Sequence, residues 1–156
     1  MGVSSEVLQT ATLWLDPARA GFAQPSDWQA WAARQLEKHE QPPSWLFDVL
    51  VAGNQSELAE ALCRAGSPPL GSGIAIIGYA LMKSWQMGED PRTVMKECVD
   101  IADAYETEVS VEAIGSLQDH LNVSGLVGPD AWRYVFSELG DCCAHAFRDW
   151  TLLCRA

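Results

Sequence analysis

The sequence predicts an all-α protein, a single helical bundle of about eight short to medium helices that spans residues 1–156. Three observations carry this prediction. β-Branched residues are scarce, apolar residues recur at helical spacing with almost no alternation of period two, and proline and glycine stand where helices would begin and end. The length is that of one ordinary domain, and a hydrophobic content of 48% is enough to bury a core.

The first four expected helices span residues 4–15, 26–40, 44–52 and 54–65. Pro17 ends the first of them, because proline lacks the amide hydrogen that a continuing helix needs. Ser26 begins the second, and Ser26 with Gln29 has the spacing of a capping box. Pro43 suits the first turn of the third helix, and Asn54 is expected to cap the fourth.

The last four expected helices span residues 74–86, 90–105, 111–121 and 129–153. Gly66 closes the fourth helix and Gly88 closes the apolar fifth. Pro91 and Pro129 begin the sixth and the eighth, since proline is favoured in a first turn. Gly78, inside the fifth helix, predicts a close contact with another helix. The connections are short, so we expect neighbouring helices to pack antiparallel.

The net charge of −11 is concentrated in the C-terminal half of the chain. Residues 1–88 carry eight acidic and five basic residues, whereas residues 89–156 carry thirteen acidic and five basic residues. An acidic surface repels phosphate groups, so binding to nucleic acid or to an anionic membrane surface is disfavoured. A basic protein partner is electrostatically allowed.

The sequence predicts neither a membrane-spanning nor a secretory segment. The longest apolar run, residues 74–82, has nine residues, whereas a spanning helix needs ~20. The N-terminal MGVSSEVLQT shows no basic region before an apolar run, so no signal peptide is expected. A cytoplasmic location is the simplest expectation. There the five cysteines would be reduced, with neither a disulfide framework nor a zinc site.

The segment ECVDIADAYETEVSVE, residues 97–112, holds six carboxylates and no Lys or Arg. On a helix, Val94 and Cys98 would face the core, while Asp100 and Asp103 would face the opposite side. An amphipathic helix with an acidic outer face accounts for this pattern. Its repulsions cost a few tenths of a kcal/mol each, and only Lys96 is near enough to compensate. Such charge indicates a second role, the attraction of a cationic partner.

A second hypothesis is a magnesium site formed by Glu57, Glu60, Glu97 and Asp100. Carboxylate pairs from facing helices can hold Mg²⁺. The ExxE and ExxD pairs resemble those of the all-α nucleoside triphosphate pyrophosphohydrolases, although their separation is longer than is usual in that family. The resemblance implies a Mg²⁺-dependent hydrolase with all four residues as ligands. Against it, Glu57 and Glu60 lie opposite Leu58 on their helix, and no basic cluster follows to hold a triphosphate.

The histidines offer weaker alternatives. Glu138, Asp141 and His145 share one face of the last expected helix and could ligate a metal, but a solvated face accounts for them as well. His39 falls inside the apolar face of its helix, in the last turn, which favours a partly buried structural role. His120 belongs to no motif.

The tryptophan-rich segment WQAWAARQLEKHEQPPSWLFDVL, residues 28–50, the small size, the acidity and the all-helical pattern resemble the small acidic immunity proteins of bacteria, which neutralise a toxin. The resemblance implies protein binding without catalysis and without a cofactor, with an acidic helical face covering a basic active site. One of the tryptophans near the start of the second helix is expected to be an exposed anchor. A scaffold or regulatory subunit would show the same features. The expected partner-binding residues are Asp100, Asp103, Glu106, Glu108, Glu112, Trp28 and Trp31.

Overall fold

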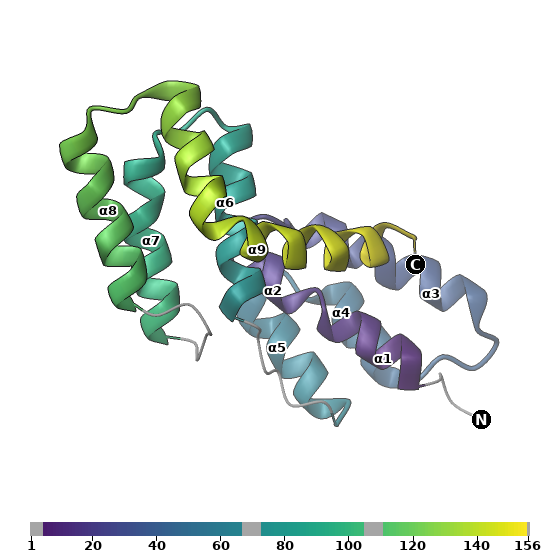
Figure 1. The fold of residues 1–156 in the computed structure, drawn as a ribbon. Coiled ribbons are helices and arrows are strands. Elements are labelled where there is room, and N and C mark those ends of the chain that lie inside the picture. The colour runs from purple at the N-terminus through teal and green to yellow at the C-terminus, as the bar shows by residue number, and fades with distance from the viewer. Residues whose placement is uncertain (1–4, 67–72, 105–110, 156) are drawn as a thin grey trace.

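The computed structural model describes residues 5–66, 73–104 and 111–155 (Figure 1). Over these residues the chain forms nine α-helices and no strand, so the prediction of an all-α helical bundle is confirmed. No described helix combines the length and the apolarity that crossing a membrane takes. The helices are α1 (Ser5–Thr12), α2 (Leu15–Arg19), α3 (Pro25–Lys38), α4 (Ser44–Val51), α5 (Gln55–Arg64), α6 (Gly73–Gln86), α7 (Pro91–Ala104), α8 (Val111–Ser124) and α9 (Gly128–Arg155).

The N-terminal helix expected over residues 4–15 is divided in the structure. α1 ends at Thr12, and the short α2 begins at Leu15 with Trp14 as its N-cap residue. Pro17 therefore lies in the first turn of α2 and not after the end of a helix, which corrects the prediction. Proline is tolerated there because the amide groups of a first turn have no partner within the helix.

α3 begins one residue earlier than expected, with Pro25 in its first position. The carboxylate of Asp27 accepts a hydrogen bond of 2.7 Å from the backbone N–H of Gln24. The expected capping pair of Ser26 and Gln29 is therefore wrong, because Gln24 and Asp27 take those roles. Gln29 Nε2 instead donates a hydrogen bond of 2.8 Å to the backbone carbonyl at the C-cap of α4.

The start of α5 is capped as the sequence predicts. Asn54 Oδ1 accepts a hydrogen bond of 2.9 Å from the backbone N–H of Glu57. Glu57 Oε2 in turn accepts a hydrogen bond of 2.6 Å from the backbone N–H of Gly53. The bond to Asn54 satisfies an amide group that the first turn of the helix leaves open, and a cap of this kind contributes about 1 kcal/mol. The carboxylate of Glu57 is therefore engaged in a hydrogen bond at the start of its own helix.

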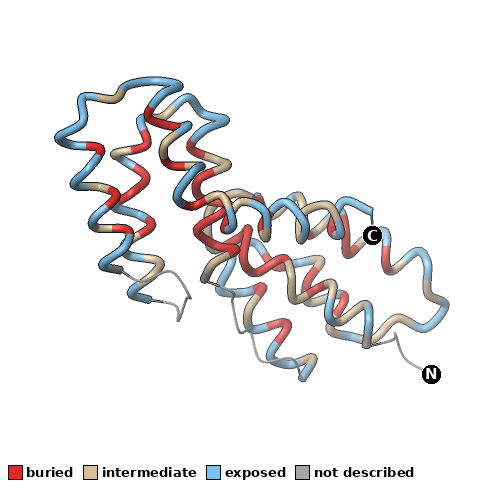
Figure 2. Tube along the Cα trace, in the orientation of Figure 1, coloured by how far each residue is buried: buried red, intermediate tan, exposed pale blue. Residues whose placement is uncertain are grey.

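The buried side chains form two large hydrophobic clusters. Figure 2 marks the buried positions along the chain. The first cluster gathers α1 to α5 around Trp31 and includes Leu153 near the end of α9. The second gathers α6, α7, α8 and the first half of α9, with Trp132 among its members. A small third cluster around Tyr79 and Ala146 lies where α6 meets α9. α6 and α9 make the most extensive helix contact and connect the two regions.

α6 and α9 approach closely at Gly78, as the sequence predicts. A Cβ atom at this position would lie 2.6 Å from the carbonyl carbon of Cys142 and 2.9 Å from the Cβ of Ala146. α9 bends near this contact, where Leu139 has φ −115° and ψ 18°. Gly140 follows it directly, and a glycine lowers the cost of a bend in a helix. The bend directs the two halves of α9 into different clusters (Figure 1).

Candidate functional site

α7 exposes carboxylates on its outer side, as the sequence predicts. Val94 and Cys98 are fully buried in the second hydrophobic cluster. Glu97, Asp100 and Asp103 are exposed. The spacing of three and four residues separates these two sets, because it keeps each set on its own side of a helix. The predicted acidic outer side of α7 is thus confirmed for these residues.

α8 lies beside α7 and adds further carboxylates (Figure 1). It buries one apolar stripe that includes Leu117, while Glu112 and Asp119 are exposed. Glu112 and Asp119 are seven residues apart and therefore lie on the same side of the helix. Asp119 was not among the residues that the sequence singled out. Glu106 and Glu108, which the sequence did single out, lie outside the described residues.

The exposed carboxylates of α7 and α8, here called the acidic helix pair, are Glu97, Asp100, Asp103, Glu112 and Asp119. None of them forms an ion pair with a basic residue in the described part of the chain. Arg92 Nη2 instead donates hydrogen bonds of 2.6 Å to the carbonyls of Leu121 and Leu126. Lys96 is exposed, and with Arg92 it makes up the two basic residues of α7 and α8. The helix pair therefore presents net negative charge to solvent.

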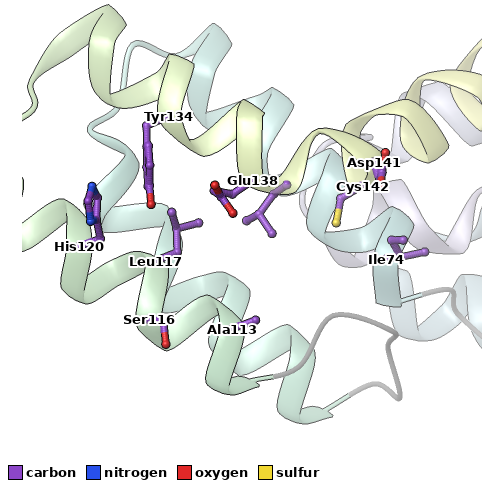
Figure 3. A pocket seen from close by; sticks show the side chains of 10 residues that line it. Ile74, Ala113, Ser116, Leu117, His120, Tyr134, Glu138, Asp141 and Cys142 are labelled. Atoms are coloured by element: carbon purple, nitrogen blue, oxygen red, sulfur yellow. The ribbon is translucent and has the colours of Figure 1, made fainter.

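A hollow of about 490 Å³ lies between α8 and α9 (Figure 3). His120 of α8 and Tyr134 of α9 stack beside it, with ring centroids 4.4 Å apart and planes 19° apart. Leu117 and Cys142 contribute apolar surface, and Glu138 contributes a carboxylate. An apolar floor with a few polar groups suits the binding of a side chain or a small molecule.

The sequence alone did not predict this hollow, because it forms only where side chains of two different helices, α8 and α9, face each other. On α8, Ala113, Ser116 and His120 lie on one flank of the apolar stripe, at spacings of three and four residues. On α9, Tyr134 and Glu138 are four residues apart and likewise lie on one flank of the apolar stripe. Flanks of small and polar residues are the signal that the sequence offers. The spacing within each helix does not show which flank of one helix will face which flank of another.

The thiol that lines the hollow is not an activated nucleophile. Burial raises the pKa of Cys142 to about 12, and the neighbouring thiol of Cys143 and carboxylate of Asp141 act in the same direction. Burial also raises the pKa of Cys143 to about 11 and raises the pKa of Cys98. A thiol that stays protonated at neutral pH is a poor nucleophile. The arrangement therefore favours binding over thiol chemistry.

Thiol labelling should divide the cysteines into two classes. At about pH 8, close to the ordinary pKa of cysteine, the exposed Cys63 and Cys154 should react rapidly with an aromatic disulfide reagent. Cys98 and Cys142, which are 0% and 1% exposed, should react only when urea unfolds the chain. The absorbance of the released thiolate measures both phases. A Cys63→Ser and Cys154→Ser double variant should lose most of the rapid phase, and a full rapid phase in it would contradict the burial.

Trp28 and Trp31 are not surface anchors, so that prediction is wrong. Their exposed fractions are 2% and 0%, and both belong to the first hydrophobic cluster. Trp28 Nε1 donates a hydrogen bond of 3.0 Å to the carbonyl of Ala52, which uses its one polar atom inside the fold. Trp85, near the end of α6, is 57% exposed. The expected exposed tryptophan therefore exists, but at a position that sequence reasoning did not choose.

The four carboxylates of the magnesium hypothesis are not brought together. Glu57 and Glu60 lie on α5, which packs on α2 and α4, whereas Glu97 and Asp100 lie on α7, which packs on α6 and α8. Glu57 also holds the N–H of Gly53 at the start of α5. Across residues 5–66, 73–104 and 111–155, no group of three or more His, Cys, Asp or Glu side chains is placed to hold a metal ion. The proposed four-ligand geometry is therefore wrong.

His145 and His39 occupy structural positions on their helices. Nδ1 of His145 lies 2.8 Å from the backbone carbonyl of Asp141, so it is the protonated nitrogen that donates this hydrogen bond. The set of Glu138, Asp141 and His145 therefore does not form the metal site considered above. His39 is partly buried at the C-cap of α3, in agreement with a structural role.

Comparisons of the chain with protein-family models, with curated proteins and with solved structures find no match. The charge, burial and shape of the surface are therefore the features that indicate a function. Two features stand out on this surface, the acidic helix pair and the hollow between α8 and α9.

Proposed function

We propose that this chain is a protein-binding domain of the immunity type, which neutralises a basic toxin in the cytoplasm by covering it with the acidic helix pair. One observation carries the proposal. Five exposed carboxylates on two neighbouring helices have no ion-pair partner in the described part of the chain. Lys and Arg side chains of a partner would supply the missing counter-charge.

The charge on α7 works against the stability of the isolated helix. Asp100 and Asp103 are three residues apart, and such a pair of like charges costs a few tenths of a kcal/mol. Both also lie in the C-terminal part of α7, where the helix dipole disfavours negative charge. A basic partner would remove both penalties on binding. The sequence keeps an arrangement that costs stability in the free chain and favours the complex.

Complementary charge also acts before contact. Opposite potentials on two proteins steer their encounter and raise the association rate, especially at low ionic strength. A rapid encounter suits an inhibitor that must bind its target before the target acts. The hollow between α8 and α9 lies beside the helix pair and has Glu138 and Asp141 in its lining, so it could receive a basic side chain of the same partner.

The proposal is tested by capture followed by reconstitution. The chain is used to capture proteins from its native cell, and the column is washed with rising salt before mass spectrometry. A stoichiometric basic partner that leaves as salt rises is the expected result. The purified partner is then titrated with the Asp100→Lys and Asp103→Lys double variant. Two lost pairs at about 1.5 kcal/mol each predict a dissociation constant about 100-fold higher.

A charge-matched control separates the site from the overall charge. Glu37 and Glu40 are exposed in and just after α3, away from α7 and α8, and Glu37→Lys with Glu40→Lys makes the same change in net charge. This control should bind the partner within about threefold of the wild type, because distant exposed charges are screened. Equal losses in both variants would mean that only net charge matters. Unchanged binding by the α7 variant would show that the acidic helix pair is not the interface.

A further inference from the structure

An aromatic groove of about 420 Å³ opens where α6 ends and where α7 and α9 begin. Trp85 and Trp132 line it, together with Pro91 and Pro129. All of its lining residues belong to the described ranges and none of them lines the hollow between α8 and α9. It is thus a second site, formed by segments that are more than thirty residues apart in the sequence.

The aromatic side chains of this groove are held in fixed positions. Trp132 is 6% exposed, and its Nε1 donates a hydrogen bond of 2.9 Å to the carbonyl of Glu89. Phe136 stacks on Trp132 with ring centroids 5.3 Å apart. Trp85 meets Phe136 edge-on, with ring centroids 6.0 Å apart and planes 81° apart. The rings are therefore arranged before any ligand arrives, which lowers the entropy cost of binding.

Trp85 is 57% exposed although it belongs to this ordered set of rings. Met87 and Val127, on the connections to α7 and α9, are 63% and 69% exposed. Large apolar side chains gathered on one end of a molecule indicate an interaction surface more often than an ordinary solvated surface. Tryptophan is also the residue most often found as an anchor in protein interfaces.

The charge around the groove selects the kind of ligand. Glu89 and Asp90 are among its lining residues, and no Lys or Arg is. Arg92 lies near, with its Nη1 3.3 Å from Asp90 Oδ1, but its Nη2 donates to two backbone carbonyls, one in the last turn of α8 and one just after that helix. Asp90 is therefore partly neutralised, and Glu89 has no ion pair with a described basic residue. Aromatic faces beside a carboxylate form a favourable site for an organic cation.

We propose that this groove binds the guanidinium group of an arginine presented by the basic partner. The inference rests on the proposed function, because it assigns one anchor within that interface. A guanidinium stacks on tryptophan through its flat face and keeps its N–H groups for a carboxylate at the edge. Trp85 would provide the exposed ring and Glu89 the carboxylate. Lysine has no flat cation, so it would fit the same groove less well.

The test uses nuclear magnetic resonance of the indole N–H groups, with small probes in place of the partner. N-acetyl-arginine amide should shift the indole signals of Trp85 and Trp132 in a saturable way, with a dissociation constant in the millimolar range. N-acetyl-citrulline amide has the same shape without the charge and should shift them much less. Glu89→Gln should weaken arginine binding about fivefold and leave the response to citrulline unchanged.

Two variants show whether the exposed ring carries the binding. Trp85→Leu should abolish the saturable shift of the Trp132 signal, whereas Phe147→Leu, which changes another exposed ring (64%) in the second half of α9, should not. Equal responses to arginine and citrulline would overturn the assignment of a cation. A missing response, or one that survives Trp85→Leu, would overturn the site. Because these probes need no partner, a failure here is distinct from a failure of the acidic helix pair to bind a protein.

Discussion

Gly78→Ala is expected to lower the free energy of unfolding by about 3 kcal/mol, although alanine is the better helix former. The added Cβ would lie 2.6 Å from the carbonyl carbon of Cys142 and closer still to its carbonyl oxygen. The obstacle is the backbone of α9 and not a flexible side chain, so the two helices must move apart. α6 and α9 connect the two hydrophobic clusters, so their separation would disturb packing on both sides.

Gly115→Ala is the matched control for this prediction. Gly115 also lies inside a helix, α8, and a Cβ atom there would meet nothing within 4 Å. This change should raise the free energy of unfolding by roughly 0.5–1 kcal/mol, which is the ordinary gain of alanine over glycine in a helix. Urea unfolding measures both variants. In thermal unfolding the loss for Gly78→Ala corresponds to a decrease of about 6–12 °C. Equal stability of the two variants would contradict the close approach of α6 to α9.

Much of the fold could be predicted from local patterns. The side of α7 that carries Asp100 and Asp103 follows from helical spacing, which needs no knowledge of the neighbouring helices. The cap at Asn54 likewise depends on residues within one turn. Gly78 could be recognised as a contact because a glycine weakens the interior of an apolar helix unless a neighbouring backbone needs the space.

The errors arise where the outcome depends on distant segments. Trp28 has the same local pattern whether its ring is buried or exposed. In the structure its ring packs where α3 meets α4 and donates to the carbonyl of Ala52 at the C-cap of α4. Pro17 can end one helix or lie in the first turn of the next, and the two alternatives look alike in sequence. The hollow beside His120 and the groove beside Trp85 form only where separate helices meet. Periodicity within one helix does not contain that information.

Arg92→Met is the second change for which a large loss of stability is expected. The side chain of Arg92 is 24% exposed. Its Nη2 donates to the carbonyls of Leu121 and Leu126, each at 2.6 Å. A charged donor at the end of α8 satisfies the carbonyl of Leu121, which the helix leaves open, and also complements the helix dipole. Its second bond holds the carbonyl of Leu126 in the connection to α9. Methionine keeps the apolar stem and removes these bonds. We expect a loss of about 2–3 kcal/mol, because hydrogen bonds to charged groups are worth more than neutral ones.

Arg133→Met provides the comparison, because this arginine makes only an exposed contact in the described structure. Its Nη1 lies 3.4 Å from Asp130 Oδ1, and the two side chains are 80% and 66% exposed. Exposed ion pairs contribute about 0–1 kcal/mol, so this variant should unfold at nearly the wild-type urea concentration.

Hydrogen exchange adds a local measurement of the effect of Arg92→Met. In Arg92→Met the amides of the last turn of α8 should exchange faster, since that turn loses the group that fixes its carbonyls. If exchange there is unchanged while global stability falls, Arg92 acts through packing and not through the end of α8. If it increases, the link between the start of α7 and the end of α8 is what holds the acidic helix pair together.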